Sequence, residues 1–163
     1  MGLHMVETKF DRAMKEFVWN ILEIQSQLED IHSVWARLLG ITEPQWLMLM
    51  AIMDLDEGHG VAGIDVAKKL RVHPTFVASQ TKSLAKFGLL DRRTRSDDAR
   101  FVQMLATEQA TAAIAKLAEK KASLNSTMFA DLDEGRLAEL NTALLAIAKN
   151  VRLAVRLLAI EVL

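Results

Sequence analysis

The segment from Asp65 to Arg100 concentrates positive charge that the rest of the chain lacks. It holds nine lysine or arginine residues and four aspartates, a net +5, whereas the whole chain of 163 residues is −1, so the remainder sums to −6. Lysine and arginine bind phosphate oxygens through charge-assisted hydrogen bonds. A basic block on a slightly acidic protein therefore predicts a binding surface for a polyanion.

The order of elements in this segment indicates that the polyanion is duplex DNA. Asp65 is suited to cap a short helix ending near residue 70, residues 71–73 form a turn, and Pro74 opens a second helix that ends at Gly88. A helix–turn–helix places its second helix in the major groove. The outward candidates for DNA contact are Thr75, Ser79, Lys82 and Lys86, and the residues expected to face inward are Phe76, Val77, Leu84 and Phe87.

A basic β-hairpin is predicted directly after this helix. Residues 89–95 and 100–105 alternate as two strands, and Ser-Asp-Asp between them suits a turn. Asp98 and Arg100 are spaced to form a salt bridge that would shape the tip of the hairpin. Arginine suits a narrow, electronegative minor groove. The arginines available for it are Arg92, Arg93, Arg95 and Arg100.

Two long helices at opposite ends of the chain must position this block. Apolar residues recur in steps of four and three from Phe10 to Leu38, in a helix predicted over residues 6–39, and again from Leu137 to Leu158, in a helix that Asp131 or Asp133 starts. Such a stripe needs another long helix or a partner chain to cover it. Gly40 is expected to end the first helix, Thr42 to cap a helix over 44–55, and Thr107 to cap a helix to about residue 128.

These patterns predict a mainly α fold with a small β-hairpin wing, in which the N- and C-terminal helices form a dimerisation layer. Residues 1–40 and 107–163 are assigned to the helical dimerisation region, and residues 41–106 to a winged helix–turn–helix DNA-binding lobe. The chain has no cysteine, no uninterrupted apolar run of about 18 residues and no signal peptide, so we expect a cytoplasmic protein without membrane contact. No catalytic, cofactor-binding or metal-binding motif stands out, so we expect no enzyme activity, cofactor or metal.

A ligand pocket is a second candidate site. Trp35, Trp46 and Met50 are expected near the junction of the first two helices, with His32 one turn from Trp35. Aromatic walls with a polar anchor would suit a small aromatic acid or a phenol. Trp and Met at helical spacing are also typical of a protein core, and the sequence leaves both interpretations open.

Several motifs in order resemble one known family. They are TEPQW at 42–46, PTFVASQTKSLAKFGLL at 74–90, DRR at 91–93, DDAR at 97–100 and LAT at 105–107. With this set the chain resembles MarR-type winged helix–turn–helix regulators along most of its length. Phe76, Ala78 and Ser79 stand where the family often has small hydroxyl residues and an arginine, so base specificity does not carry over.

The resemblance implies a homodimeric transcriptional regulator that binds a palindromic operator in double-stranded DNA. It also implies a small-molecule pocket between the dimerisation layer and the DNA-binding lobe, with repression relieved by the ligand. The alternative is a winged-helix dimeric adaptor that acts through protein–protein contacts without operator binding, because a fold does not determine a function.

Overall fold

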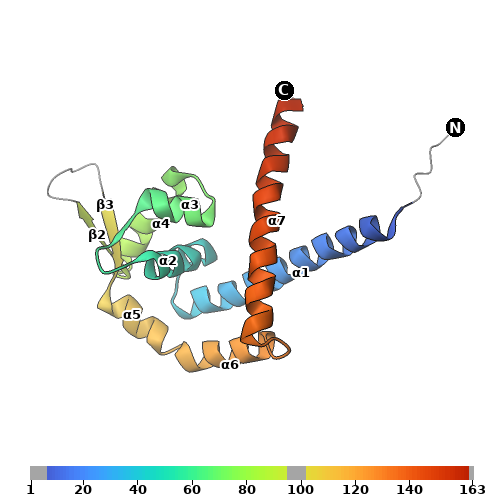
Figure 1. Ribbon diagram of the computed structural model, residues 1–163. Helices are drawn as coiled ribbons and strands as arrows, with labels where there is room; N and C mark the ends of the chain where they lie inside the picture. The colour runs from blue at the N-terminus through green and yellow to red at the C-terminus, as the bar shows by residue number, and fades with distance from the viewer. Residues whose placement is uncertain (1–6, 95–101, 162–163) are drawn as a thin grey trace. The chain divides into compact units, whose positions relative to one another are not determined.

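The computed structural model describes residues 7–94 and 102–161. The chain divides into two compact units, Met1–Ala115 and Lys116–Leu163. The described residues form a winged helix–turn–helix fold of helices and one small antiparallel sheet (Figure 1). In chain order the elements are α1 (Lys9–Leu38), α2 (Glu43–Leu55), β1 (Val61–Ala62), α3 (Gly63–Leu70), α4 (Pro74–Lys86), β2 (Leu90–Thr94), β3 (Val102–Ala106), α5 (Glu108–Ala115), α6 (Ala118–Met128) and α7 (Glu134–Glu161).

The predicted ends of the first two helices are confirmed. Gly40 adopts φ +70°, its N–H donates to the Arg37 carbonyl, and the Ile41 N–H donates to the Ala36 carbonyl, which is the pairing of a Schellman motif. The Thr42 N–H donates to Gln45 Oε1 at 3.0 Å and so starts α2 as predicted. These caps terminate α1 and turn the chain into α2 within four residues.

A further cap lies at the start of α1. The Thr8 side chain accepts a hydrogen bond from the Asp11 N–H, and the Asp11 carboxylate accepts hydrogen bonds from the side chain and the backbone N–H of Thr8. These bonds to the charged form lower the pKa of Asp11. The carboxylate also lies in the first turn, where it complements the positive end of the helix dipole.

The sheet has one strand more than the predicted hairpin. β1 pairs antiparallel with β3, with Val61 opposite Met104 and Ala62 opposite Gln103, so the strand order is β1-β3-β2. A strand of two residues after a glycine-rich loop is too short to show alternation in sequence. The chain passes from it directly into α3, so Asp65 lies in the first turn and Ala62 occupies the capping position. The prediction that Asp65 caps this helix was wrong.

Two glycines in the loop before β1 differ in the space around them. Gly58 and Gly60 both have positive φ, +96° and +78°, and both N–H groups donate to Asp56 Oδ1. A Cβ on Gly58 would meet nothing within 4 Å, whereas a Cβ on Gly60 would lie 2.8 Å from Leu105 Cδ1. Gly60 therefore permits the close approach of this loop to β3.

Substitution of these two glycines is expected to separate backbone strain from steric overlap. Gly58→Ala should lower the free energy of unfolding by about 1 kcal/mol, the cost of a left-handed conformation for alanine. Gly60→Ala should lower it by about 3 kcal/mol, because overlap with Leu105 adds to the same strain. Urea unfolding of both variants measures the difference, and equal losses would show that the Leu105 side chain moves aside without cost.

The helix predicted from Thr107 to about residue 128 is interrupted. Thr107 caps it as expected, because its Oγ1 accepts from the Ala110 N–H at 3.1 Å and its hydroxyl donates to the Gly88 carbonyl at 2.7 Å. The helical hydrogen bonding stops at Ala115 and resumes at Ala118, so α5 and α6 are separate helices. Neither proline nor glycine marks this break, and the prediction of one continuous helix was wrong.

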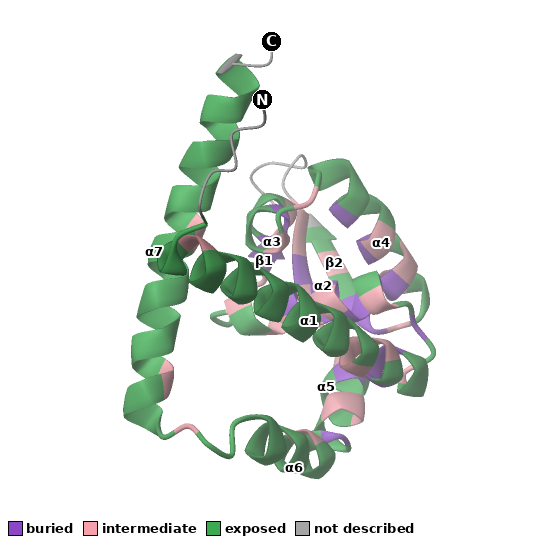
Figure 2. Ribbon diagram, turned by 90° about the vertical axis from the view of Figure 1, so that its right-hand side faces the viewer, coloured by how far each residue is buried: buried purple, intermediate pink, exposed green. Residues whose placement is uncertain are grey.

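The core of the first unit is centred on α2, which contacts α1, α3, α4 and β3. Buried residues lie on α2 and on the elements around it (Figure 2). The largest fully buried side chains of this core come from α2, α3 and α4. They include Trp46, Met48, Leu49, Ile52, Val66, Val77, Thr81 and Leu84. The helix α1 contributes little to this core. Only Trp35 and Ala36, near its C-terminal end, are buried.

The two apolar stripes predicted at the ends of the chain are largely exposed in the single chain. In α1 the stripe residues from Phe10 to Leu28 are exposed, and in α7 those from Leu140 to Leu158 are exposed as well. Asp133 starts α7, since its Oδ1 accepts from the Arg136 N–H at 2.8 Å, which confirms one of the two predicted starts. The division of the chain into a dimerisation region and a lobe over residues 41–106 stays a prediction.

Candidate nucleic-acid interface

The helix α4 is fixed in the lobe by both of its ends and by one buried stripe. His73 caps it, because its Nδ1 accepts from the Thr75 N–H at 3.2 Å, and Pro74 occupies the first helical position. At the other end Gly88 has φ +71°, and the Leu89 N–H donates to the Leu84 carbonyl. The stripe that faces the core is Val77, Thr81 and Leu84.

A buried threonine in that stripe was not anticipated from sequence. The Thr81 hydroxyl donates to the Val77 carbonyl one turn earlier at 2.8 Å, so its polar group is satisfied inside the core. Phe76 and Phe87, which were expected to face inward, are 39% and 52% exposed. Phe76 precedes Val77 by one residue and so lies about 100° around the helix from it. The prediction of an inward Phe76 and Phe87 was wrong.

The outward face of α4 brings together all four predicted contact residues of this helix. Thr75, Ser79, Lys82 and Lys86 are exposed, and with Ala78 and Ser83 they line a shallow depression of about 410 Å³. The face offers two hydroxyl groups towards the helix N-terminus and two ammonium groups towards the C-terminus. Hydroxyls can bond base edges or phosphates, and ammonium groups neutralise phosphates.

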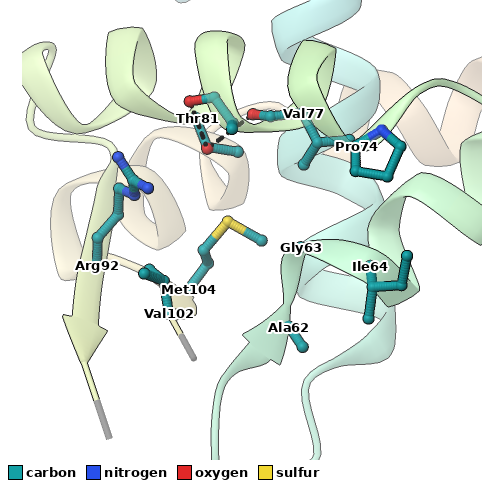
Figure 3. Close-up of a pocket in the computed structure, with 10 residues that line it drawn as sticks. Ala62, Gly63, Ile64, Pro74, Val77, Thr81, Arg92, Val102 and Met104 are labelled. Atoms are coloured by element: carbon teal, nitrogen blue, oxygen red, sulfur yellow. Dashed lines mark hydrogen bonds between the residues drawn. The ribbon is translucent and has the colours of Figure 1, made fainter. Parts of the chain in front are cut away.

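The arginines of β2 point in two directions. Arg93 is exposed, and its Nη2 lies 3.5 Å from Asp91 Oδ2, a weak surface pair. Arg92 is opposite Met104 in the sheet and lines a cavity of about 310 Å³ between α4, β1 and the wing strands (Figure 3). Because neighbouring residues of a strand face opposite sides, the two side chains cannot share one surface. Arg95, Asp98 and Arg100 lie outside the described residues.

The cavity under α4 is mainly apolar. Its lining residues come from the start of α3, from α4 and from the sheet, and include Gly63, Ile64, Val77, Ala78, Val102 and Met104. Arg92 Nε is buried there and has no hydrogen-bond partner among the described residues. A buried donor without a partner costs free energy, so an anionic group entering this cavity would be stabilised by Arg92.

The second predicted site lies where α1 contacts α2. The rings of Trp35 and Trp46 stack with centroids 6.4 Å apart and an interplanar angle of 29°, and the residues are only 6% and 2% exposed. His32 lies one turn before Trp35 on α1, and Met50 one turn after Trp46 on α2, and both are half-buried. The two indole rings therefore pack against each other in the core where α1 meets α2.

Two aspartates, one in the last turn of α2 and one just after it, interact with other groups of the protein. Asp54 pairs with Lys69, and Asp56 accepts two backbone hydrogen bonds. Within residues 7–94 and 102–161, no group of three or more His, Asp or Glu side chains is placed to hold a metal ion. No helix in the same ranges is both long and apolar enough to cross a lipid bilayer.

Solved structures share this fold over most of the chain. AbsC, a MarR family transcriptional regulator from Streptomyces coelicolor, is 21% identical, with a TM-score of 0.71 over 89% of this chain and 96% of its own. A MarR family regulator from Listeria monocytogenes, solved with a 26mer DNA, is 17% identical, with a TM-score of 0.70 over 82% of this chain and 87% of its own. The organohalide-sensing regulator RdhR, in its 2,4-dichlorophenol-bound form, is 18% identical, with a TM-score of 0.65 over 92% of this chain and 89% of its own.

No protein-family model matches the chain, and no curated protein sequence matches it. At these identities the likeness to the solved structures establishes the fold.

Proposed function

We propose that this chain, which has the fold of MarR-family regulators, is itself a transcriptional regulator of that family and binds duplex DNA. One observation carries the proposal: the outward face of α4 gathers Thr75, Ser79, Lys82 and Lys86 on the second helix of a helix–turn–helix. Such a helix enters the major groove, where hydroxyl and ammonium groups meet base edges and phosphates. Arg93 on the wing, together with Arg95 and Arg100, would contact the neighbouring backbone or minor groove.

The same proposal includes a homodimer. The apolar stripes of α1 and α7 are exposed in the single chain, and a second copy would cover stripes of the same chemistry on both partners. A two-fold dimer would place two copies of α4 about one helical turn of DNA apart, so the operator would be palindromic.

Fluorescence anisotropy with labelled duplex from upstream of the protein's own gene tests DNA binding. We expect the logarithm of the binding constant to fall linearly with the logarithm of salt concentration, with a slope of about −0.9 for each phosphate neutralised. Binding that is absent, or that does not change between about 50 and 200 mM salt, would contradict the proposal.

We further propose that the protein represses transcription and that a small aromatic acid or phenol relieves this repression. Two places support it. One is the set of His32, Trp35, Trp46 and Met50, and the other is the cavity beside Arg92. The cavity has a volume of about 310 Å³ and adjoins both α4 and the wing. A ligand bound there would change the distance between these two elements, both of which are assigned to DNA contact. RdhR was solved with 2,4-dichlorophenol bound.

Calorimetric titration with benzoate in the absence of DNA distinguishes these two places. If benzoate binds beside Arg92, Arg92→Met should lower its affinity about tenfold or more, because the charge-assisted hydrogen bond is lost, and Trp35→Phe should leave it unchanged. The opposite pattern would assign the ligand to the tryptophan pair. No heat with benzoate or phenol, and no release of bound DNA, would contradict ligand relief.

The alternative function is a dimeric adaptor that contacts other proteins. The exposed apolar residues of α7 and the net −6 outside the basic segment favour it. It predicts a stable dimer that binds no duplex from a random-sequence library at low salt. A single specific duplex would exclude it as the sole function.

A further inference from the structure

One edge of α4 carries an exposed aromatic ring that the core does not use. Phe76 is 39% exposed although the next residue, Val77, is 1% exposed and faces the core. It lies in the first turn of α4, the end of such a helix that contacts bases. Gln80 follows one turn later and is half-buried. Residues i and i+4 lie on the same helix face, so Phe76 and Gln80 form one edge.

This edge adjoins the face that is assigned to DNA. Ser83 lines the depression on the outward face of α4, and it is three residues after Gln80 and seven after Phe76. Those spacings place Ser83 on the same edge of the helix, one turn from Gln80 and two turns from Phe76. If α4 inserts this face into the major groove, Phe76 and Gln80 therefore lie beside the base edges that line the groove.

The charges of α4 limit what its first turns can recognise. From Pro74 to Thr81 the helix has no lysine or arginine, and Lys82 is the first. The bidentate contact of arginine with guanine, the commonest specific contact in DNA complexes, is therefore not available in these turns. Phe76 and Gln80 at this edge suit an A·T base pair instead. A glutamine amide forms hydrogen bonds with N6 and N7 of adenine, and a phenyl ring packs on the methyl group of thymine.

We infer that Phe76 and Gln80 determine specificity by recognising thymine and adenine at base pairs one or two steps apart in each half-site. Phe76 and Gln80 are four residues apart and so lie about 6 Å apart along α4. Successive base pairs are about 3.4 Å apart, so the two side chains reach base pairs that are one or two steps apart. The inference rests on the proposed function, and it adds two residues to those already assigned to DNA.

The experiment uses the full chain and a random-sequence duplex library. Sites selected by the unaltered protein give a consensus, which is then synthesised with uracil in place of thymine at each position in turn. At one position in each half-site, loss of the 5-methyl group should weaken binding about fourfold, the effect of withdrawing one methyl-sized group from an apolar contact. At a position one or two base pairs away, Gln80→Leu should lower the preference for adenine over the other bases about tenfold.

Phe76→Ala is the decisive variant, and Phe87→Ala is its matched control. Phe87 is also exposed, and it follows the last residue of α4, away from the end assigned to bases. Phe76→Ala should no longer distinguish thymine from uracil at the assigned position, whereas Phe87→Ala should retain the fourfold difference.

If Phe76→Ala keeps the same uracil penalty at every position, the inference is overturned while the proposed function stands. If the unaltered protein selects no sequence from the library, the proposed function is overturned and this inference with it.

Discussion

Replacement of Lys82 by glutamate is expected to lower the affinity of the protein for its DNA site by about 100-fold. Losing one hydrogen bond between charged groups costs about 1.5–3 kcal/mol, and a carboxylate at the same place adds repulsion from phosphates. Lys82 is exposed on the outward face of α4, so the substitution removes no core contact. Anisotropy across a salt series should show a lower affinity. The plot of the logarithm of the binding constant against the logarithm of salt concentration should also have a slope smaller in magnitude by about one.

Lys120→Glu is the matched control for this charge reversal. Lys120 is exposed on α6, outside the basic segment, and its replacement changes the net charge equally. It should leave the affinity within about twofold, since Lys120 does not belong to the face of α4 that is assigned to DNA. If both variants weaken binding equally, net charge and not the face of α4 controls binding. Thermal unfolding of both should match the unaltered protein.

Replacement of Ile24 by aspartate in the stripe of α1 is expected to abolish the dimer. Ile24 is 54% exposed in the single chain and would be buried between two copies. An unpaired carboxylate in an apolar interface should weaken association by more than about 3 kcal/mol, or over 100-fold. Sedimentation equilibrium should show a dimer for the unaltered protein and a monomer for this variant, and Leu144→Asp in α7 should act in the same way.

Ser26→Asp is the control for this substitution. Ser26 is two residues after Ile24, on the opposite side of α1, and is also exposed. The variant should remain dimeric and retain DNA binding. A monomeric Ser26→Asp variant, or a dimeric Ile24→Asp variant, would show that the α1 stripe is not the interface. If two copies of α4 bind one site, as proposed, the monomer should also lose affinity for a palindromic duplex.

The elements with strong local signals could be predicted from sequence. Gly40, Thr42, Pro74 and Gly88 mark helix ends by chemistry that acts within a few residues, and all four act there in the structure. The basic face of α4 followed from helical spacing alone. Signals of this kind do not depend on what the rest of the chain does.

Features that depend on distant partners could not be predicted. β1 exists because Val61 pairs with Met104, more than forty residues away, and two residues cannot show a pattern by themselves. The direction of Arg92 depends on the pairing register of the wing, which turns it into a cavity while Arg93 stays outside. The break between α5 and α6 has no sequence marker.

The sequence by itself determined a helix–turn–helix with a positive outward face, because helix ends, helical spacing and charge are local properties of the chain. The tertiary structure alone decided which residues of that helix remain exposed. The core accepts a single stripe of α4, and it takes Val77, Thr81 and Leu84, since the Thr81 hydroxyl bonds within its own helix. Phe76, apolar but outside that stripe, is therefore left on the edge that would meet the bases.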